Sequence, residues 1–240
     1  MEDGFFFAAP KFFGAFFYCR RFMFNLLTLD TTDIVVSASV VAIVILFLIA
    51  FAIGTKKAVF STKKITAIAL AIALTTTLSF LKFSLPFGGS ITVFSLVPVI
   101  IVSYYYGFYY GLFTGFITGL LQFITSPYIL TPLTFFLDYV FAFSAICFAG
   151  VFKKLFKNAT LSVSLGAIAF FLVRYIMHVF SGFLYFNAGW ITEGFPTSSA
   201  FIYSLCYNAV YVLPDMIIAL IFIIPFSTRK VFKDNLLLTK

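Results

Sequence analysis

The chain has 240 residues, of which 62% are hydrophobic and 10% are charged. Soluble domains carry about 25% charged residues, so this composition excludes a soluble fold and predicts a polytopic helical membrane protein in a lipid bilayer. The net charge of +8 does not indicate a nucleic-acid partner. The basic residues gather at the ends of apolar runs, as the positive-inside bias of membrane proteins requires.

Residues 1–33 are rich in Phe but contain Lys11, Arg20 and Arg21, which predicts an interfacial arm, not a span or a cleavable signal. A membrane-spanning helix needs about 20 apolar residues. The candidate spans are Ile34–Gly54, Ile65–Leu81, Ile91–Tyr106, Phe108–Ile124, Leu133–Phe152, Leu161–Phe186 and Ala200–Phe226. We therefore expect an all-α protein in which residues 1–60 form the arm and one extra transmembrane helix, and residues 61–240 form a membrane domain of six helices.

Lysine and arginine residues set the expected orientation of these spans. Basic clusters follow the first, fifth and last spans, at 56–64, 153–157 and 229–233. The loops on the opposite face, near 82–90, 125–132 and 187–199, carry only Lys82 and Glu193 as charged residues. We expect a multi-pass plasma-membrane protein whose C-terminus is cytoplasmic. The extra first span would then begin on the outer face.

Small residues recur on two of the predicted helices. Gly107, Gly111, Gly115 and Gly119 form a smooth ridge of the kind that lets membrane helices approach closely, either within one bundle or between chains. On the preceding span, Ala67 and Ala71 interleave with Ala69 and Ala73 as two AxxxA pairs. Contact with another subunit and packing inside the bundle both remain open for this alanine helix.

Asp138 is the one ionised side chain between Lys82 and Lys153. A carboxylate in so long an apolar stretch is costly unless it faces a cavity, a partner group or a cation. It follows the loop that ends at Pro132, so at 1.5 Å per residue it lies about 9 Å below the start of its span. This depth predicts a shallow pocket that opens outward, with Tyr128 and Tyr139 beside it.

The next span places four side chains on one helix face, because they are spaced four residues apart. They are Arg174, His178, Gly182 and Phe186, and the stripe leads toward Trp190. A plain ion pair between Asp138 and Arg174, with a structural histidine, is the alternative interpretation.

The last span adds Tyr203 and Asn208 near its outer start, with Asp215 deeper. An asparagine in lipid needs hydrogen-bond partners. Together these groups suit a small planar cation with ring nitrogens, which would neutralise Asp138 and stack on the aromatic rings. A metal site would need more than one His. No GxxxxGK[ST] sequence occurs, so we expect no nucleotide-binding loop and no cofactor.

Four short motifs keep their order and spacing along the chain. They are Pro127-Tyr128-Ile129-Leu130, Phe136-Leu137-Asp138-Tyr139, Arg174-Tyr175-x-x-His178-x-x-x-Gly182 and Tyr203-Ser204-Leu205-x-x-Asn208. Over residues 62–230 this pattern resembles the thiamine-specific substrate-binding (S) component of energy-coupling-factor (ECF) vitamin transporters.

The resemblance implies a six-helix core that binds thiamine at the outer face. It also implies that the AxxxA helix docks on a transmembrane scaffold subunit driven by two ATPase subunits. The implied thiamine site comprises Asp138, Tyr139, Tyr128, Arg174, His178, Gly182, Phe186, Trp190, Tyr203 and Asn208. The chain departs from the family in having Asp138 where Glu is usual and Arg174 where Lys is usual. Phe186 stands where a Trp is expected, with Trp190 one turn on.

Other functions stay open at this point. The ligand could be another vitamin or a thiamine precursor, which would leave the S-component role unchanged. A stand-alone organic-cation transporter could instead use Asp138 and Asp215 to exchange protons. We do not expect an enzyme, because a single His without a nucleophile motif offers little for catalysis.

Overall fold

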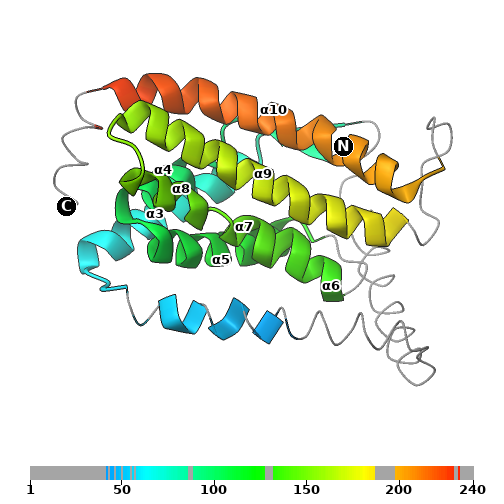
Figure 1. Cartoon of the computed structure of the whole chain (residues 1–240), viewed down its shortest axis with the longest axis horizontal. Coiled ribbons are helices and arrows are strands. Elements are labelled where there is room, and N and C mark those ends of the chain that lie inside the picture. Colours follow the sequence, from blue (N-terminus) through cyan, green and yellow to red (C-terminus); the bar gives the residue numbers. More distant parts are fainter. Residues whose placement is uncertain are drawn as a thin grey trace, which may run out of the picture.

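The computed structural model describes residues 58–85, 89–127, 132–186 and 198–229, together with Phe232 and several positions between 42 and 56. The Phe-rich arm, Tyr128 and Trp190 therefore lie outside the described residues. Figure 1 shows the helices lying along one long axis, with α9 and α10 side by side over most of their length.

The described helices follow the predicted spans closely. They are α3 (Thr62–Ser79), α4 (Val97–Tyr106), α5 (Phe108–Thr125), α9 (Ala159–Phe186) and α10 (Ala200–Thr228), with an interrupted helix between α5 and α9. The interrupted helix consists of α6 (Pro132–Phe135), the π-helical turn η1 (Phe136–Phe141), α7 (Ala142–Ser144), α8 (Cys147–Val151) and the 3₁₀ turn η2 (Phe152–Lys154).

Four of these stretches are long and apolar enough to cross a membrane. They are Phe108–Thr125, Leu133–Lys154, Ala159–Phe183 and Ala200–Thr228, while α4 is a shorter apolar helix. The predicted all-α polytopic membrane fold is confirmed.

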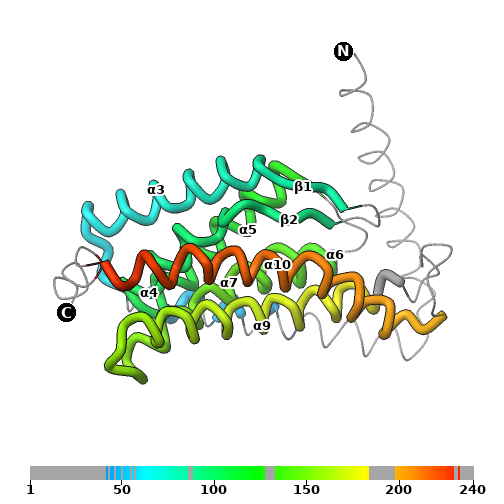
Figure 2. Tube along the Cα trace, turned by 90° about the horizontal axis from the view of Figure 1, so that it is seen from above, coloured from blue at the N-terminus to red at the C-terminus, as the bar shows by residue number. Residues whose placement is uncertain are grey.

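One predicted boundary is wrong. The third span was expected to begin at Ile91, but Ile91 lies in a small antiparallel hairpin of β1 (Lys82–Ser84) and β2 (Ser90–Thr92). Figure 2 shows this hairpin extending from the end of α3. Helix α4 begins only at Val97, with Pro98 in its first turn, where the missing amide hydrogen of proline costs nothing.

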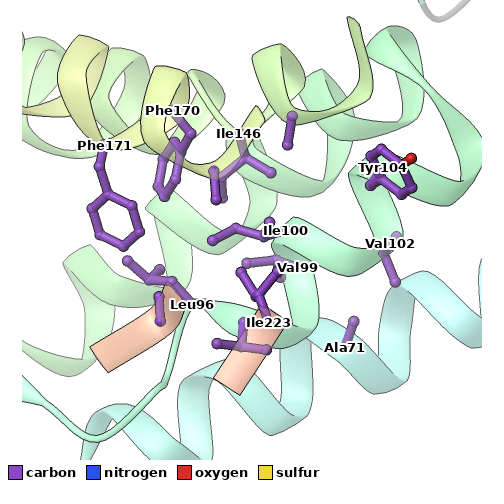
Figure 3. Close-up of a cluster of buried hydrophobic side chains, with 14 of the residues drawn as sticks. Ala71, Leu96, Val99, Ile100, Val102, Tyr104, Ile146, Phe170, Phe171 and Ile223 are labelled. Atoms are coloured by element: carbon purple, nitrogen blue, oxygen red, sulfur yellow. The ribbon is translucent and has the colours of Figure 1, made fainter. Parts of the chain in front are cut away.

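The core is built around α4, which is buried between α3, α5, α8 and α9. Val99 and Ile100 of α4 are completely buried, and Ile146, Phe170 and Ile223 reach them from three other segments (Figure 3). A short helix that is apolar on all sides is expected in such a place. The outward faces of the longer helices carry exposed Leu and Ile side chains, as lipid-facing surfaces do.

The glycine ridge packs inside the bundle. A Cβ atom added at Gly115 would collide with the carbonyl oxygen of Phe143, and one at Gly119 would collide with that of Tyr139. A Cβ at Gly111 would collide with Ser103 and with the backbone of Cys147. Helix α5 therefore lies directly against the backbone of the interrupted helix that carries Asp138, and of the two alternatives, packing within one bundle is the one found for these three glycines.

The described part of the extra first span is helical and lies beside α5 (blue in Figure 1). Phe47 stacks edge-on to Phe141 with 5.0 Å between ring centroids, and Phe51 lies 4.8 Å from Phe116. The opposite face of this helix exposes Ile45, Leu48, Ile49 and Ile53. Its membrane-spanning character and its status as a separate unit remain predictions.

Candidate ligand-binding site

A chain of hydrogen bonds joins η1 to α9 around Asp138. The Nδ1 atom of His178 lies 2.8 Å from Oδ1 of Asp138, and Nε of Arg174 donates to Nε2 of His178 at 3.2 Å. Because Nε2 accepts a hydrogen bond, the imidazole is neutral and carries its proton on Nδ1, from which it donates to Asp138. The alternative of a plain Asp138–Arg174 pair is wrong in this respect, since His178 bridges the two residues.

Ser181 completes the support of the carboxylate. Its hydroxyl donates to Oδ2 of Asp138 at 2.6 Å. Ser181 and His178 are both buried, whereas the Asp138 side chain keeps 22% of its surface exposed. Both carboxylate oxygens are thus held from the α9 side while part of the group stays accessible.

Asp138 lies within the π-helical turn η1. Such turns are rare, occur mostly as single bulges in longer helices, and are frequent at functional sites. A π turn contains one more residue than an α turn, so it changes which side of the helix the following residues face. Here the helix is tied to α5 by Tyr139, whose hydroxyl donates to the carbonyl of Ser126 at 2.8 Å.

Asn208 links α10 to α9 below the same site. Its Nδ2 donates to the carbonyl oxygens of His178 at 3.1 Å and of Ser204 at 2.8 Å. Tyr211 donates its hydroxyl to Oδ1 of Asn208 and presents its ring edge-on to His178, with 5.9 Å between centroids. The amide is therefore fixed at both ends, and His178 is held through its backbone as well as through its ring.

Arg174 lies one turn before His178 on α9 and is the first residue of that helix in the network. Its guanidinium carbon lies 4.6 Å from the centroid of the Phe143 ring, within the range of a cation–π contact. Within the described part of the chain, its buried Nη1 atom has no hydrogen-bond partner. The guanidinium is therefore held by one hydrogen bond to His178 and by its contact with the Phe143 ring.

The described structure brings Asp138, Arg174, His178 and Asn208 into one connected network. Tyr203 is buried and stacks on Tyr207 with 6.0 Å between ring centroids. Gly182 lies in α9 one turn beyond His178, and Phe186 ends that helix.

Ser181 and Tyr211 were not among the predicted site residues. Each follows a predicted residue by three positions on the same helix, Ser181 after His178 and Tyr211 after Asn208. Side chains three positions apart are neighbours on a helix surface, so this spacing is the signal that could have identified both.

Asp215 lies one turn beyond Tyr211 on α10 and is buried. Its Oδ1 accepts from the backbone N–H of Thr92 at 2.8 Å and from the Thr92 hydroxyl at 3.3 Å. This carboxylate therefore attaches α10 to the end of the β1–β2 hairpin. Across the described residues, no three His, Cys, Asp or Glu side chains come together as a metal site would require.

The two AxxxA pairs of α3 differ in exposure. Ala71 is buried in the core, 5% exposed, and Ala67 is half-buried, while Ala69 and Ala73 are exposed. Ala71 thus packs inside its own bundle, because it shares the inward face of α3 with Ile68, Ile72 and Thr75. The exposed pair is the one available to another chain.

A partly exposed carboxylate, 22% accessible, is held by buried donors among long apolar helices. The molecule is a polytopic membrane protein, and ionisable groups within membrane helices commonly belong to the paths or sites of solutes. The sequence profile of one family, described as thiamine transporter protein (Thia_YuaJ), matches residues 65–233. The chain belongs to this family, a family of transporters and not of enzymes, and the membership indicated by the four motifs is confirmed.

Comparison with individual proteins supports the same family assignment. The chain is 34% identical over 148 residues to the thiamine transporter ThiT of Bacillus subtilis (strain 168), covering 58% of this chain and 74% of that protein. The solved structure of ThiT from Listeria monocytogenes is similar with a TM-score of 0.62 and 26% identity, covering 72% of this chain and 96% of the other. The S component of a bacterial ECF transporter gives a TM-score of 0.48 at 23% identity, over 69% of this chain and 94% of that one, a likeness too weak to carry an argument.

Proposed function

We propose that this protein captures thiamine at the outer face of the plasma membrane and serves as the S component of an ECF-type transporter. The observation that carries the proposal is Asp138, a partly exposed carboxylate whose two oxygens are held by His178 and Ser181. Thiamine carries a permanent positive charge on one of its two aromatic rings, and a fixed carboxylate in a low-dielectric site can neutralise such a charge.

The remaining predicted residues have distinct proposed roles. Arg174 and His178 orient Asp138, and Asn208 fixes the backbone of His178. The rings of Tyr128, Tyr139, Phe186, Trp190 and Tyr203 would stack on the vitamin, and Gly182 would leave room for it on the α9 stripe. The protein binds its ligand without changing it, so no cofactor takes part.

The deciding experiment is mass spectrometry of small molecules extracted from protein purified without added ligand, followed by titration of the emptied protein with thiamine. We expect thiamine in the extract and saturable binding at one site, with or without ATP. Recovery of a different vitamin would show that thiamine is not the ligand. The absence of any saturable binding would overturn the proposal.

The proposed scaffold contact lies on the exposed alanines of α3. The double variant Ala69→Trp, Ala73→Trp should retain thiamine binding but lose uptake in cells that supply the scaffold and the two ATPase subunits, because bulky side chains keep partner helices apart. The matched control is Ile221→Trp on α10, a position that is 61% exposed and should tolerate the change. Full thiamine uptake by the double variant would show that Ala69 and Ala73 are not part of the docking surface.

Orientation and domain organisation complete the proposal. Residues 61–240 form the substrate-binding domain with a cytoplasmic C-terminus, and residues 1–60 form a separate N-terminal unit. In a variant whose Cys19, Cys147 and Cys206 are replaced by Ser, a cysteine introduced at Thr239 should react with a membrane-permeant maleimide but not with an impermeant one in intact cells. Reaction with the impermeant reagent would place the C-terminus outside.

A further inference from the structure

We propose that Gly89 of the β1–β2 hairpin is a positioning residue of the binding site: because it has no side chain, the hairpin lies directly against the ring of Tyr211 and holds that ring in place. The inference rests on the proposed thiamine binding. It adds a hairpin residue to a hydrogen-bond network that is otherwise built from η1, α9 and α10.

The space beside Gly89 is filled by the Tyr211 ring. A Cβ atom built on Gly89 would lie 2.7 Å from Cδ1 of Tyr211 and 3.3 Å from its Cε1 and Cγ atoms. Carbon atoms in favourable contact are about 3.5–4.0 Å apart, so any other residue at this position has to displace the ring or the hairpin. Gly89 also has a φ of +72°, in the left-handed region that favours glycine. Space and backbone conformation therefore both call for glycine here.

The hairpin is fixed against α10 at a second point. Strand β2 packs beside α10 (Figure 2), and Thr92 donates from its backbone N–H and its hydroxyl to Oδ1 of Asp215. Asp215 lies one turn beyond Tyr211 on α10. The backbone N–H of Leu85 donates to the carbonyl oxygen of Gly89 at 3.2 Å and ties Gly89 into the hairpin. A larger residue at Gly89 would therefore push on the tyrosine ring, because the hairpin behind it is anchored.

The other contacts of Tyr211 belong to the site. Its hydroxyl donates to Oδ1 of Asn208, and its ring lies edge-on to His178. Tyr207 lies edge-on to the same ring, with 5.9 Å between centroids. The Asn208 amide in turn donates to the backbone carbonyl of His178, whose ring is bonded to Asp138. A displaced tyrosine ring would withdraw its hydroxyl from Asn208 and loosen the support of the carboxylate.

The test compares two glycines that share a left-handed backbone but differ in their surroundings. Gly107 has a φ of +98°, and a Cβ atom there would meet no atom of the described residues within 4 Å. Gly89→Ala should weaken thiamine binding about 2- to 12-fold, the change in affinity that one neutral hydrogen bond produces. Gly107→Ala carries a similar backbone strain and should leave thiamine affinity unchanged. Titration of both full-length variants in detergent measures the difference; equal losses, or no loss in Gly89→Ala, would overturn the inference.

A double-mutant cycle shows whether the effect passes through the tyrosine ring. Tyr211→Ala removes the ring, so adding Gly89→Ala to it should cause no further loss of thiamine affinity. Losses that multiply would show that the hairpin acts by another route and would contradict the inference.

Gly89→Asn, with Gly107→Asn as its control, replaces the alanine pair if Gly89→Ala is too unstable to titrate. Asparagine tolerates a positive φ better than alanine does but still carries the colliding Cβ atom, so the loss of affinity should persist at Gly89 only. Failure of the unaltered protein to bind thiamine would overturn the proposed function instead of this inference.

Discussion

The two halves of α9 share one helix but are built in different ways. Toward its start, Val163, Ala167, Phe170 and Phe171 are buried among apolar side chains of α4 and α8. From Arg174 onward, the inward side chains make hydrogen bonds to η1 and, through the backbone of His178 and Val179, to α10.

The first half of α9 is held by apolar packing and the second half by hydrogen bonds, so the two halves should contribute differently to stability and to binding. Packing contacts are non-directional and set where the helix lies, whereas hydrogen bonds are directional and set how individual groups face. Changes in the first half should therefore reduce stability and leave affinity alone, while changes in the second half should do the opposite. Four substitutions test this separation.

Phe170→Ala should have the largest effect, and on stability only. Truncating a buried Phe costs about 3–5 kcal/mol, because it removes apolar contacts and leaves a cavity. We expect a clearly lower thermal unfolding temperature in detergent with an unchanged dissociation constant for thiamine. The neighbouring Leu172, 49% exposed toward lipid, provides the control, since Leu172→Ala should lower the unfolding temperature far less. A loss of thiamine affinity in Phe170→Ala at temperatures where it stays folded would show that the first half of α9 also contributes to binding.

Asp138→Asn should have the opposite profile. Removing one partner of a desolvated charge pair costs about 2–4 kcal/mol, which is about 30- to 1000-fold in affinity. The unfolding temperature should change little, because the amide oxygen can still accept from His178 and the amide NH2 can donate to the Ser181 hydroxyl, which rotates to accept. Isothermal titration with thiamine measures the effect, and Asp138→Glu, which keeps the charge, is the control. Unchanged affinity in Asp138→Asn would remove this residue from the site.

Ser181→Ala should weaken binding more modestly. A hydrogen bond to a charged group contributes about 1.5–3 kcal/mol, and Asp138 would keep its bond to His178. We expect about a tenfold or greater loss of affinity by the same titration. The control comes from the first half of the helix, where Ser164 has a buried hydroxyl that bonds to nothing in the described residues. Ser164→Ala should leave affinity unchanged; equal losses in both variants would point to a general effect of removing hydroxyls from α9.

Tyr211→Phe should have the smallest effect. It removes the hydroxyl that holds the Asn208 amide but keeps the ring against His178, at a cost of about 0.5–1.5 kcal/mol. Thiamine affinity should fall a few-fold. Tyr105→Phe removes a comparable hydroxyl bond, to the carbonyl of Phe232, and should change stability without changing affinity. If Tyr105→Phe lost more thiamine affinity than Tyr211→Phe, then residues that affect binding and residues that affect stability would not lie in separate parts of the bundle.

Much of this arrangement follows from the sequence. The lone Asp138 and the four-residue spacing of Arg174 and His178 indicated a shared polar face, since helix periodicity fixes which residues of one helix align. Apart from the start of α4, the helices lie close to the apolar runs from which they were predicted. Both predictions depend on local properties of a single segment.

The interleaving of residues from different helices could not be predicted in the same way. The position of His178 between Asp138 and Arg174 depends on the rotation and separation of η1 and α9, which no single segment encodes. The π turn at Asp138 and the β1–β2 hairpin also depend on neighbours. The hairpin is attached to α10 through Asp215 and Thr92, residues separated by more than a hundred positions along the chain.

The glycine ridge of α5 sets the distance between two helices. A Cβ atom at Gly111, Gly115 or Gly119 would overlap neighbouring atoms, so any larger residue there must push the Asp138 helix away from α5. The position of Asp138 relative to α9 therefore depends on three residues that carry no side chain and lie on a third helix.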